Sequence, residues 1–355
     1  MHSSQTDPPL WAVVLAGGTG SRFWPVSTPA RPKQLLPLAG EEPLISQTID
    51  RINPLVSPER IRVLTGRHLA DPILQAVPGL TRAQLMVEPM ARGTAPALVW
   101  AAHAIAREEP DAVMASLHAD HVITPNEAFR ELLADVARLA AAHRLLFTIG
   151  IEPTRPETGY GYIHVGPPIG PRVEAWRVAD FVEKPDRDTA QEYLRRGGYL
   201  WNSGIFVWRV RDLLDQIQAH TPELARLMPL LDAGDVVGFF EQAPDLSIDE
   251  GLLERSPDVG VARATFAWDD VGAWDAVGRT RQPDADGNVA IGDVHLVDSK
   301  DCVAWSEDGS IVVFGGEGLV VVRAHGITVV AARERTPDLK ELLRQLPERL
   351  REPGK

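Results

Sequence analysis

The sequence predicts an α/β fold with a mixed, mostly parallel central sheet, followed by a small β-rich module and a terminal helix. Short apolar runs alternate with helix-like stretches in the first half of the chain, and this alternation is typical of a parallel sheet covered by helices on both faces. After residue 288 only short Val-rich segments with Gly and Asp turns remain. Because 355 residues exceed what one hydrophobic core usually organises, we expect a large domain and a smaller appended one.

The strands and helices of the first half follow from hydrophobic periodicity. Apolar runs that end in Gly or polar residues indicate buried strands, and they occupy 11–16, 61–64, 85–87, 112–117 and 145–149. Stretches with helical spacing lie between them, at 43–53, 68–77, 94–108 and 125–143. Ligands of parallel sheets bind at the carboxyl ends of the strands, so we expect the loops after 16, 87 and 117 to share a binding edge.

The second half changes character. Longer extended segments at 160–165, 173–182 and 201–210, with a short helix at 188–196, indicate a strand-rich subdomain over about 158–209. Helical patterns resume over 211–256, and 259–266 has the pattern of a further strand. The turn-rich stretch 282–287 predicts a boundary between domains 1–281 and 288–355. The short strands of 288–334 favour a small β-helix or β-roll, closed by an amphipathic helix over about 337–351.

Composition and charge exclude several classes of protein. No apolar run approaches the roughly 20 residues that span a bilayer, and residues 1–10 lack the pattern of a secretory signal, so we expect a cytoplasmic protein without membrane contact. The single cysteine, Cys302, excludes an intramolecular disulfide. A net charge of −13 argues against a nucleic-acid partner, because diffuse phosphate binding needs a basic surface. Any anionic ligand must therefore be held locally.

A Gly-rich loop follows the first predicted strand. Its glycines lack Cβ atoms, so successive N–H groups can point into one phosphate-sized concavity. Arg22 adds a bidentate phosphate donor and Lys33 a mobile positive charge. The spacing is neither a P-loop nor Gly-x-Gly-x-x-Gly, which argues against a kinase and against a dinucleotide-dependent oxidoreductase. A plain strand-to-helix turn is the alternative, but Arg22, Pro32, Lys33 and Gln34 together favour a polyphosphate site.

A family resemblance emerges from this loop. Residues 15–34 resemble the signature of the sugar nucleotidyltransferases, and the Phe-Trp-Pro insert and Pro-Lys-Gln ending are similar to the mannose-1-phosphate guanylyltransferase branch. Further segments similar to that branch follow in order: Glu88-Pro-Met-Ala-Arg-Gly-Thr-Ala-Pro, Ala-Asp120-His, Thr158-Gly-Tyr-Gly-Tyr-Ile, Phe181-Val-Glu-Lys-Pro, Trp201-Asn-Ser-Gly-Ile-Phe, Ser247-Ile-Asp-Glu-Gly-Leu-Leu-Glu and Trp268-Asp-Asp-Val-Gly-Ala-Trp. The resemblance spans about 11–275 and implies a Rossmann-like nucleotidyltransferase domain.

The resemblance implies a reaction and partners. It implies transfer of GMP from GTP to α-D-mannose 1-phosphate, giving GDP-mannose and pyrophosphate, with Mg²⁺ as cofactor and a homodimer formed through 288–355. Three other hypotheses stay open: glucose 1-phosphate with UTP or dTTP, a heptose phosphate with GTP, and a catalytically silent paralogue that binds a nucleotide sugar. The chain departs from the branch at His118, where relatives often have Pro.

Two aspartates are the candidate metal ligands. Charge on an α-phosphorus attacked in line is usually neutralised by a hard divalent cation, and Mg²⁺ takes oxygen ligands. Asp120 follows a predicted strand at the binding edge, and Asp270 lies in a turn-like segment between two tryptophans. The resemblance assigns both to Mg²⁺. An Asx turn or a surface turn is the alternative, and the sequence does not decide between Asp269 and Asp270. We interpret His121 as a positioning residue.

The remaining candidates recognise the base and the sugar. Glu88 can accept the N1–H and N2–H₂ hydrogen bonds of guanine, which adenine does not offer, although an exposed loop carboxylate is the alternative. The resemblance extends the nucleotide site to Leu15, Ala16, Gly17, Gly18, Thr19, Gly20, Ser21, Arg22, Lys33, Glu88, Arg92, Gly93, Thr94 and Asp120. It assigns the sugar phosphate to Tyr160, Gly161, Glu183, Lys184 and Asn202, whose polar groups suit hydroxyls and phosphate. The catalytic set is then Arg22, Lys33, Asp120, Lys184 and Asp270.

Overall fold

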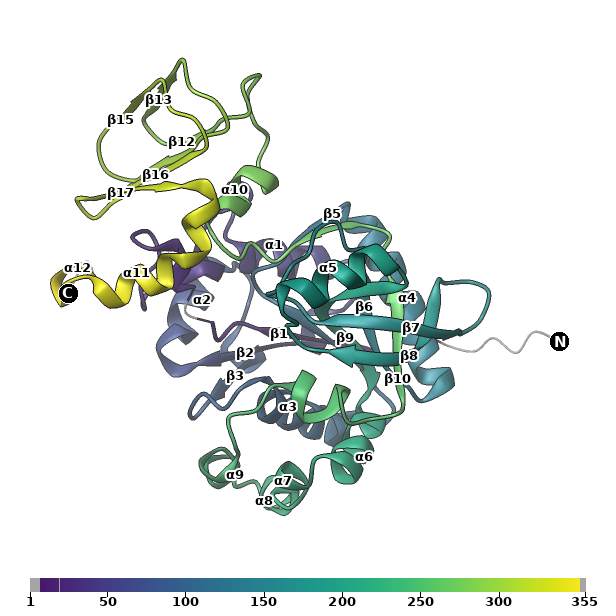
Figure 1. Ribbon diagram of the computed structural model, residues 1–355. Helices are drawn as coiled ribbons and strands as arrows, with labels where there is room; N and C mark the ends of the chain where they lie inside the picture. Colours follow the sequence, from purple (N-terminus) through teal and green to yellow (C-terminus); the bar gives the residue numbers. More distant parts are fainter. Residues whose placement is uncertain (1–6, 19, 352–355) are drawn as a thin grey trace.

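The computed structural model describes residues 7–18 and 20–351, and its centre is a nine-stranded sheet (Figure 1). The strand order is β3-β2-β1-β4-β9-β6-β10-β8-β7. The strands are β1 (Leu10–Leu15), β2 (Ile61–Gly66), β3 (Leu85–Glu88), β4 (Val113–His118), β6 (Leu146–Ile151), β7 (Tyr162–Pro168), β8 (Ala175–Val182), β9 (Tyr199–Arg209) and β10 (Val259–Arg263). Each apolar run predicted as a strand in the first half of the chain forms one of them.

The sheet is mixed, as predicted, with a larger antiparallel share than the sequence indicated. Pairing is parallel from β3 through β2 and β1 to β4, and again between β6 and β10. Strand β9 runs antiparallel to both β4 and β6, and β8 runs antiparallel to β10 and β7. The strand-rich segment 158–209 causes this difference, because its three strands β7, β8 and β9 form only antiparallel pairs.

Helices cover both faces of the sheet because side chains alternate along each strand. Trp11 and Val13 of β1 join a core with α3 (Thr94–Glu108) and α6 (Val210–His220). Ala12 and Val14 of the same strand join a second core, on the opposite face. The helices of that face are α1 (Leu44–Ile52), α2 (Ala70–Ala76) and α4 (Asn126–His143).

The remaining helices lie around these two cores. Figure 1 shows α3 and α6 to α9 on the same side of the sheet. Their bounds are α5 (Arg187–Arg196), α7 (Pro222–Ala225), α8 (Met228–Asp232), α9 (Val236–Gln242), the π-helix η6 (Asp249–Leu253) and α10 (Trp274–Thr280). Within residues 7–18 and 20–351, no helix combines the length and apolar character needed to cross a bilayer.

A small two-stranded sheet was not predicted from the sequence. Strand β5 (Val122–Thr124) pairs antiparallel with β11 (Ala267–Asp269), and Val122 is the partner of Asp269. These strands are too short to show a periodic pattern, so only the tertiary structure reveals them. Their pairing brings the loop that contains Asp120 beside the loop that contains Asp270.

The C-terminal part is a coil of short strands, as the sequence predicted. Strands β12, β14 and β16 are parallel in one layer, β13 and β15 are parallel in another, and β17 runs antiparallel to β16. Their bounds are β12 (Val289–Ile291), β13 (Val294–Val297), β14 (Val303–Ser306), β15 (Ile311–Phe314), β16 (Leu319–Ala324) and β17 (Ile327–Ala332).

The terminal helix is broken where the sequence predicted one helix over 337–351. A 3₁₀ helix, η7 (Arg333–Asp338), leads into α11 (Leu339–Gln345), and α12 (Glu348–Arg351) follows separately. Pro347 explains the interruption, because the residue before a proline disfavours the helical conformation and proline lacks the N–H that would continue the helix.

A third core connects the C-terminal strands to the segment after the Gly-rich loop. Phe23 and Trp24 pack in one cluster with Trp274, Trp305 and Leu339. The Trp274 ring is fully buried, with centroids 5.2 Å from Phe23 and 5.6 Å from Trp305. Its Nε1 donates to the carbonyl oxygen of Trp24 at 3.2 Å.

Replacing Trp274 with alanine is therefore expected to lower the free energy of unfolding by about 3–5 kcal/mol, through lost burial and a cavity. Urea unfolding followed by circular dichroism measures the change. Val237 is 53% exposed, so Val237→Ala is a control expected to change the free energy by no more than about 0.5 kcal/mol. If Trp274→Ala lowers the free energy of unfolding as little as the control does, this core does not stabilise the protein as proposed.

Candidate active site

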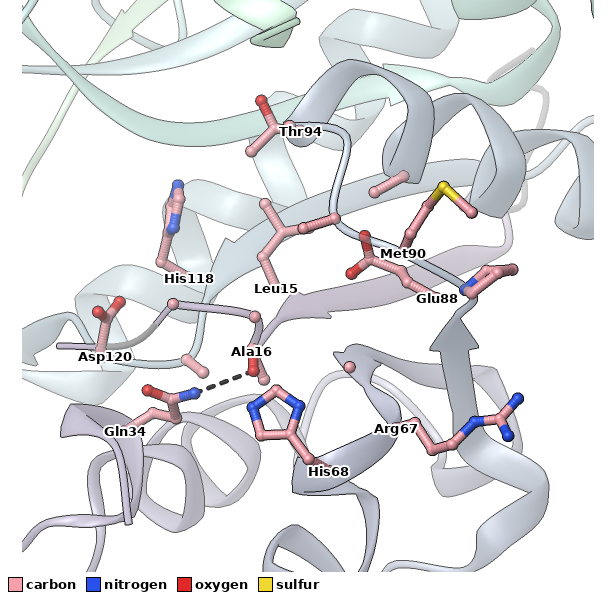
Figure 2. Close-up of a pocket in the computed structure, with 18 residues that line it drawn as sticks. Leu15, Ala16, Gln34, Arg67, His68, Glu88, Met90, Thr94, His118 and Asp120 are labelled. Atoms are coloured by element: carbon pink, nitrogen blue, oxygen red, sulfur yellow. Dashed lines mark hydrogen bonds between the residues drawn. The ribbon is translucent and has the colours of Figure 1, made fainter. Parts of the chain in front are cut away.

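A cavity of about 490 Å³ opens at the carboxyl ends of β1 to β4, the edge where the sequence predicted ligand binding (Figure 2). Figure 2 shows Asp120 and Gln34 at one end of the cavity and Glu88 with Met90 at the other. The lining residues are Leu15, Ala16, Gly17, Gly18, Gln34, Gly66, Arg67, His68, Glu88, Pro89, Met90, Ala91, Gly93, Thr94, Ala97, His118, Ala119 and Asp120.

The Gly-rich loop enters this cavity from β1. Gln34 Nε2 donates to the Ala16 carbonyl oxygen at 2.9 Å, which fixes the start of the loop. Gly17 and Gly18 are exposed and line the cavity. At Gly20 the backbone has φ 60°, and a Cβ would stand 2.3 Å from the Cβ of Lys33, so this position requires glycine.

The rest of the loop lies beside the cavity. Ser21 and Arg22 belong to the 3₁₀ helix η1 (Ser21–Phe23), and neither they nor Gly20 line the cavity. The exposed Arg22 donates Nη1 to the carbonyl oxygen of Gly272 at 3.3 Å, two residues from Asp270. Thr19, also predicted to bind the nucleotide, lies outside the described residues.

Lys33 is the buried cation at the centre of the site. It begins the 3₁₀ helix η2 (Lys33–Leu35), and only 8% of the residue is exposed. Its Nζ lies 2.9 Å from Asp120 Oδ2 and also donates to the main-chain carbonyl of Asp270. Burial opposes ionisation of Asp120, but the charge of Lys33 outweighs it and holds the carboxyl pKa at about 2. Asp120 is therefore an ionised carboxylate at neutral pH.

The structure distinguishes the two adjacent aspartates that the sequence left undecided. Asp270 Oδ1 accepts a hydrogen bond from the Tyr160 hydroxyl at 2.6 Å. Asp269 accepts from the main-chain N–H of Val271 at 2.7 Å and from Arg279 Nε at 2.8 Å. Only Asp270 thus faces the cluster around Lys33. Burial raises the pKa of the Asp270 carboxyl, and Lys33 and Tyr160 oppose this shift.

The acidic residues fit a hard divalent cation. The ligand atoms of His118, Asp120 and His121 lie within 4.8 Å of one another, and among residues 7–18 and 20–351 no other such cluster occurs. However, Trp268 Nε1 donates to His121 Nδ1 at 3.1 Å. In neutral His121 the proton is then on Nε2, which leaves no lone pair for a metal. His121 is therefore a poor ligand, and the oxygens of Asp120 and Asp270 are the fitting ones; a structural or positioning role of His121 stays a prediction.

Glu88 faces the other end of the cavity. A Cβ added to Gly17 would lie 3.7 Å from Glu88 Oε1, so the carboxylate is close to the Gly-rich loop. Burial raises its pKa to about 7. The N-terminus of α3 is next to it: Gly93 and Thr94 line the cavity, and Thr94 Oγ1 accepts from the N–H of Ile248 at 2.9 Å.

The side chain of Arg92 points away from the cavity, unlike those of Glu88 and Thr94 in the same loop. Its Nε donates to the carbonyl oxygen of Phe240 at 2.9 Å and its Nη2 to that of Glu241 at 3.3 Å. The guanidinium therefore contacts α9 and is not part of the cavity lining. A direct contact between Arg92 and a nucleotide stays a prediction.

Three polar cavity residues were not found from the sequence. Arg67 and His68 directly follow β2, and His118 ends β4. The available signal was their position, because polar residues after neighbouring parallel strands meet at one edge of the sheet. His118 was noted only as a departure from the family pattern. Burial lowers its pKa, so the imidazole is neutral near pH 7.

The predicted sugar-side residues also lie together. Asn202 N donates to the Gly161 carbonyl oxygen at 2.8 Å, and a Cβ on Gly161 would stand 2.5 Å from Glu183 Oε2. Lys184 is bonded to Glu183 Oε1, and 61% of its side chain is exposed. Because the Tyr160 hydroxyl reaches Asp270, this group adjoins the Lys33 cluster.

Comparisons with known proteins agree with this geometry. Residues 11–286 match a family model described as nucleotidyl transferase, and residues 292–346 match one described as a MannoseP isomerase/GMP-like beta-helix domain. The chain is 36% identical to the alginate biosynthesis protein AlgA of Pseudomonas aeruginosa, over 94% of this chain and 71% of that protein. It is 34% identical to a mannose-1-phosphate guanylyltransferase of Sinorhizobium fredii, over 96% of this chain and 68% of that protein.

A solved structure is similar over nearly the whole chain. It is described as mannose-1-phosphate geranyltransferase from Thermus thermophilus, with a TM-score of 0.85 and 33% identity. The similarity covers 95% of this chain and 99% of that chain.

Proposed function

We infer the reaction from the family: the chain belongs to the nucleotidyl transferase family, in the branch of the mannose-1-phosphate guanylyltransferases. We propose that it transfers GMP from GTP to α-D-mannose 1-phosphate and releases pyrophosphate. One observation carries this proposal: the cluster of Lys33, Asp120 and Asp270 lies between the large cavity and the sugar-side residues. A reaction between a nucleotide and a sugar phosphate needs charged groups at the place where the two substrates meet.

The residues of the chain act by positioning and by charge. A phosphate oxygen of the sugar phosphate is already ionised near pH 7, so it attacks the α-phosphorus without a general base. The new P–O bond forms as the bond to the β-phosphate breaks, and pyrophosphate leaves with the electron pair. We assign the amides of residues 17–21, Arg22 and Lys33 to the leaving phosphates and Lys184 to the attacking phosphate.

The family generally uses a divalent metal, and we propose Mg²⁺ for this chain. Asp120 and Asp270 would hold it, since Mg²⁺ prefers carboxylate oxygens and keeps its other positions for phosphate and water. When bound, the ion would neutralise charge on the phosphates at the reacting centre. The ammonium of Lys33, which contacts the Asp120 carboxylate and the main chain of Asp270, would add its positive charge beside these ligands.

Assembly and location are part of the same proposal. Val297, Val312, Phe314 and Val330 are exposed on the C-terminal strands, and this apolar surface supports a homodimer formed through 288–355. The chain mass is 38.8 kDa, so light scattering should report about twice that value. We propose a cytoplasmic location, where GTP is available, and 1–281 and 288–355 as the two domains.

A substrate matrix tests the proposed reaction. Pyrophosphate release is measured with GTP, ATP, UTP, CTP and dTTP against mannose, glucose and heptose 1-phosphates, with and without Mg²⁺. We expect the highest kcat/KM for GTP with mannose 1-phosphate, and only in the presence of the ion. A higher kcat/KM for another pair would replace the proposed substrates, and no release from any pair would favour a silent paralogue.

Gly161→Ala is expected to raise the KM for mannose 1-phosphate by about 10-fold or more, with little change in the KM for GTP. The new Cβ would stand 2.5 Å from Glu183 Oε2 and so displace the Glu183 carboxylate, while Asn202 Cβ, at 3.4 Å, would be barely touched. Gly159→Ala is a matched control in the same loop, since its Cβ would meet only Glu157 Oε1, at 3.3 Å. Equal KM changes for both substrates would contradict a sugar-side role.

A further inference from the structure

The segment from Leu246 to Glu254 includes a family-like motif to which the proposed reaction assigns no role. It contains the π-helical turn η6, which begins at Asp249. Such π-bulges are rare and often mark functional sites. The segment packs against residues of both half-sites, so its contacts show what it supports.

One end of the segment holds the nucleotide loop. Leu246 N donates to the Arg92 carbonyl oxygen at 3.1 Å, and Ala95 N donates to the Leu246 carbonyl oxygen at 3.0 Å. Gly93 has φ 77°, and a Cβ there would stand 2.4 Å from the Leu246 oxygen. The entry to α3 is thus built directly on this segment.

The other end holds the sugar-side residues. Glu254 Oε1 accepts from the N–H of Glu183 at 3.2 Å. Asp249 Oδ1 accepts from Nδ2 of Asn202 at 2.7 Å. Glu183 and Asn202, the two sugar-side residues, are therefore each hydrogen-bonded to a carboxylate of this one segment.

The hydrogen bonds around Asn202 fix the orientation of its amide. Its Oδ1 accepts from Thr148 Oγ1 at 2.9 Å and from Gly204 N at 3.3 Å. With the oxygen held by two donors, Nδ2 must face an acceptor, and Asp249 provides it. If that acceptor is removed, the buried amide keeps an unpaired donor and loses one of the three contacts that define its orientation.

We propose that Asp249 is a positioning residue of the sugar phosphate site, acting through the amide of Asn202, which it holds in one orientation beside Glu183. The proposal rests on the proposed function, because it takes Glu183 and Asn202 as the sugar-binding groups. Asp249 itself need not touch the sugar.

The environment of Asp249 agrees with a functional role. Burial, and then the charge of Glu183, raise its pKa to about 7. An ionised carboxyl at this position therefore disfavours the folded state above that pH, so stability does not explain its presence. Asp249→Asn, which removes the charge but keeps an acceptor for Asn202, should leave the protein at least as stable at pH 8.

Two substitutions separate positioning from a mere packing role. Asp249→Ala removes the acceptor and is expected to raise the KM for the sugar phosphate by about 10-fold, with an unchanged KM for GTP. Asp249→Asn keeps an oxygen that can accept from Asn202 and is expected to restore most of the loss. Glu250→Ala is the matched control, because Glu250 is exposed in the same turn and its hydrogen bonds go to Ser247 and Arg255, not to Asn202 or Glu183.

A double-mutant cycle with Asn202→Ala completes the test, and thermal unfolding confirms that each variant folds. If Asp249 acts through Asn202, adding Asp249→Ala to Asn202→Ala causes no further loss. Additive losses, equal loss in Asp249→Asn and Asp249→Ala, or an equal rise in the KM for GTP would each overturn the proposal. The wild-type enzyme reports separately on the proposed function. If it uses another substrate pair, the cycle is run with that pair, and if it uses none, calorimetric binding of mannose 1-phosphate replaces KM.

Discussion

Asp270→Asn is expected to lower kcat by about 10²–10³-fold, the effect of removing one preorganised charged group from an active site. Asparagine keeps the shape of the side chain and an oxygen that can accept the 2.6 Å hydrogen bond from Tyr160. The charge beside Lys33 and Asp120 is lost, so the site should hold a divalent cation less tightly. Pyrophosphate release at saturating substrates, titrated with Mg²⁺, measures both effects.

The neighbouring aspartate provides the matched control. Asp269→Asn changes the same chemistry one residue away, but Asp269 is committed to the Val271 N–H and to Arg279. We expect kcat within about 10-fold of wild type, because an asparagine oxygen still accepts from Val271 and Arg279 retains Asp275 as a partner. Equal losses in the two variants would contradict the assignment of Asp270.

Stability distinguishes lost catalysis from lost folding. Burial raises the pKa of Asp270 above its usual value, so the protonated form favours the folded state and this stabilisation is lost as pH rises through the folded-state pKa. The ionised form of this buried carboxyl is therefore a cost to the fold, which Asp270→Asn removes. The variant should unfold at the same temperature as wild type or a higher one while its activity falls.

Asp269 and Asp270 show which features of the structure sequence patterns predict and which they do not. Hydrophobic periodicity was enough to locate β1, β4 and α3, because long buried elements repeat a signal several times. It was not enough for β5 and β11, which are three residues long. Their pairing places Asp270 beside Lys33, while Asp269 is bonded to Val271 and Arg279, so this information exists only in the tertiary structure.

Distance along the chain limits the prediction of the site in the same way. Lys33 and Asp270 are separated by 237 positions, and no local pattern relates them. The family resemblance supplied this connection, whereas the residues alone indicated a phosphate loop and two isolated carboxylates. Neither the resemblance nor the residues alone predicted that Arg92 bonds to α9 or that Asp249 bonds to Asn202. Each of these contacts depends on packing against the segment 236–254. The division into 1–281 and 288–355 stays a prediction.

Glu88→Gln is expected to lower kcat/KM for GTP by about 10²-fold and to weaken discrimination against ATP. A carboxylate accepts from both guanine N1–H and N2–H₂, whereas a glutamine amide offers one oxygen and places an N–H₂ against a donor. Adenine presents an acceptor at N1, so the glutamine removes a mismatch with ATP. Competition between GTP and ATP in the pyrophosphate assay measures the change, and an unaltered ratio of kcat/KM values would contradict base recognition by Glu88.

The pH dependence provides a second readout of the same residue. Burial raises the pKa of Glu88 to about 7, so the carboxyl gains a proton as pH falls from 8 to 6 and loses one of its acceptors. The KM for GTP in the wild-type enzyme is therefore expected to rise over this interval, and the Glu88→Gln profile to be flatter. Substrate phosphates titrate nearby, so the variant measured with the same substrates is the reference.

His68 also lines the cavity beside the Gly-rich loop, so His68→Asn is a control for the pH dependence. His68→Asn should keep the rise in the KM for GTP if Glu88 is its source. If His68→Asn flattens the profile and Glu88→Gln leaves it intact, base recognition does not depend on the Glu88 carboxylate. Because a raised carboxyl pKa opposes folding above that pH, Glu88→Gln should also unfold at a higher temperature than wild type at pH 8. The Glu88 carboxylate lowers the stability of the fold and lies at the end of a nucleotide-sized cavity, so ligand binding is the best explanation of its presence.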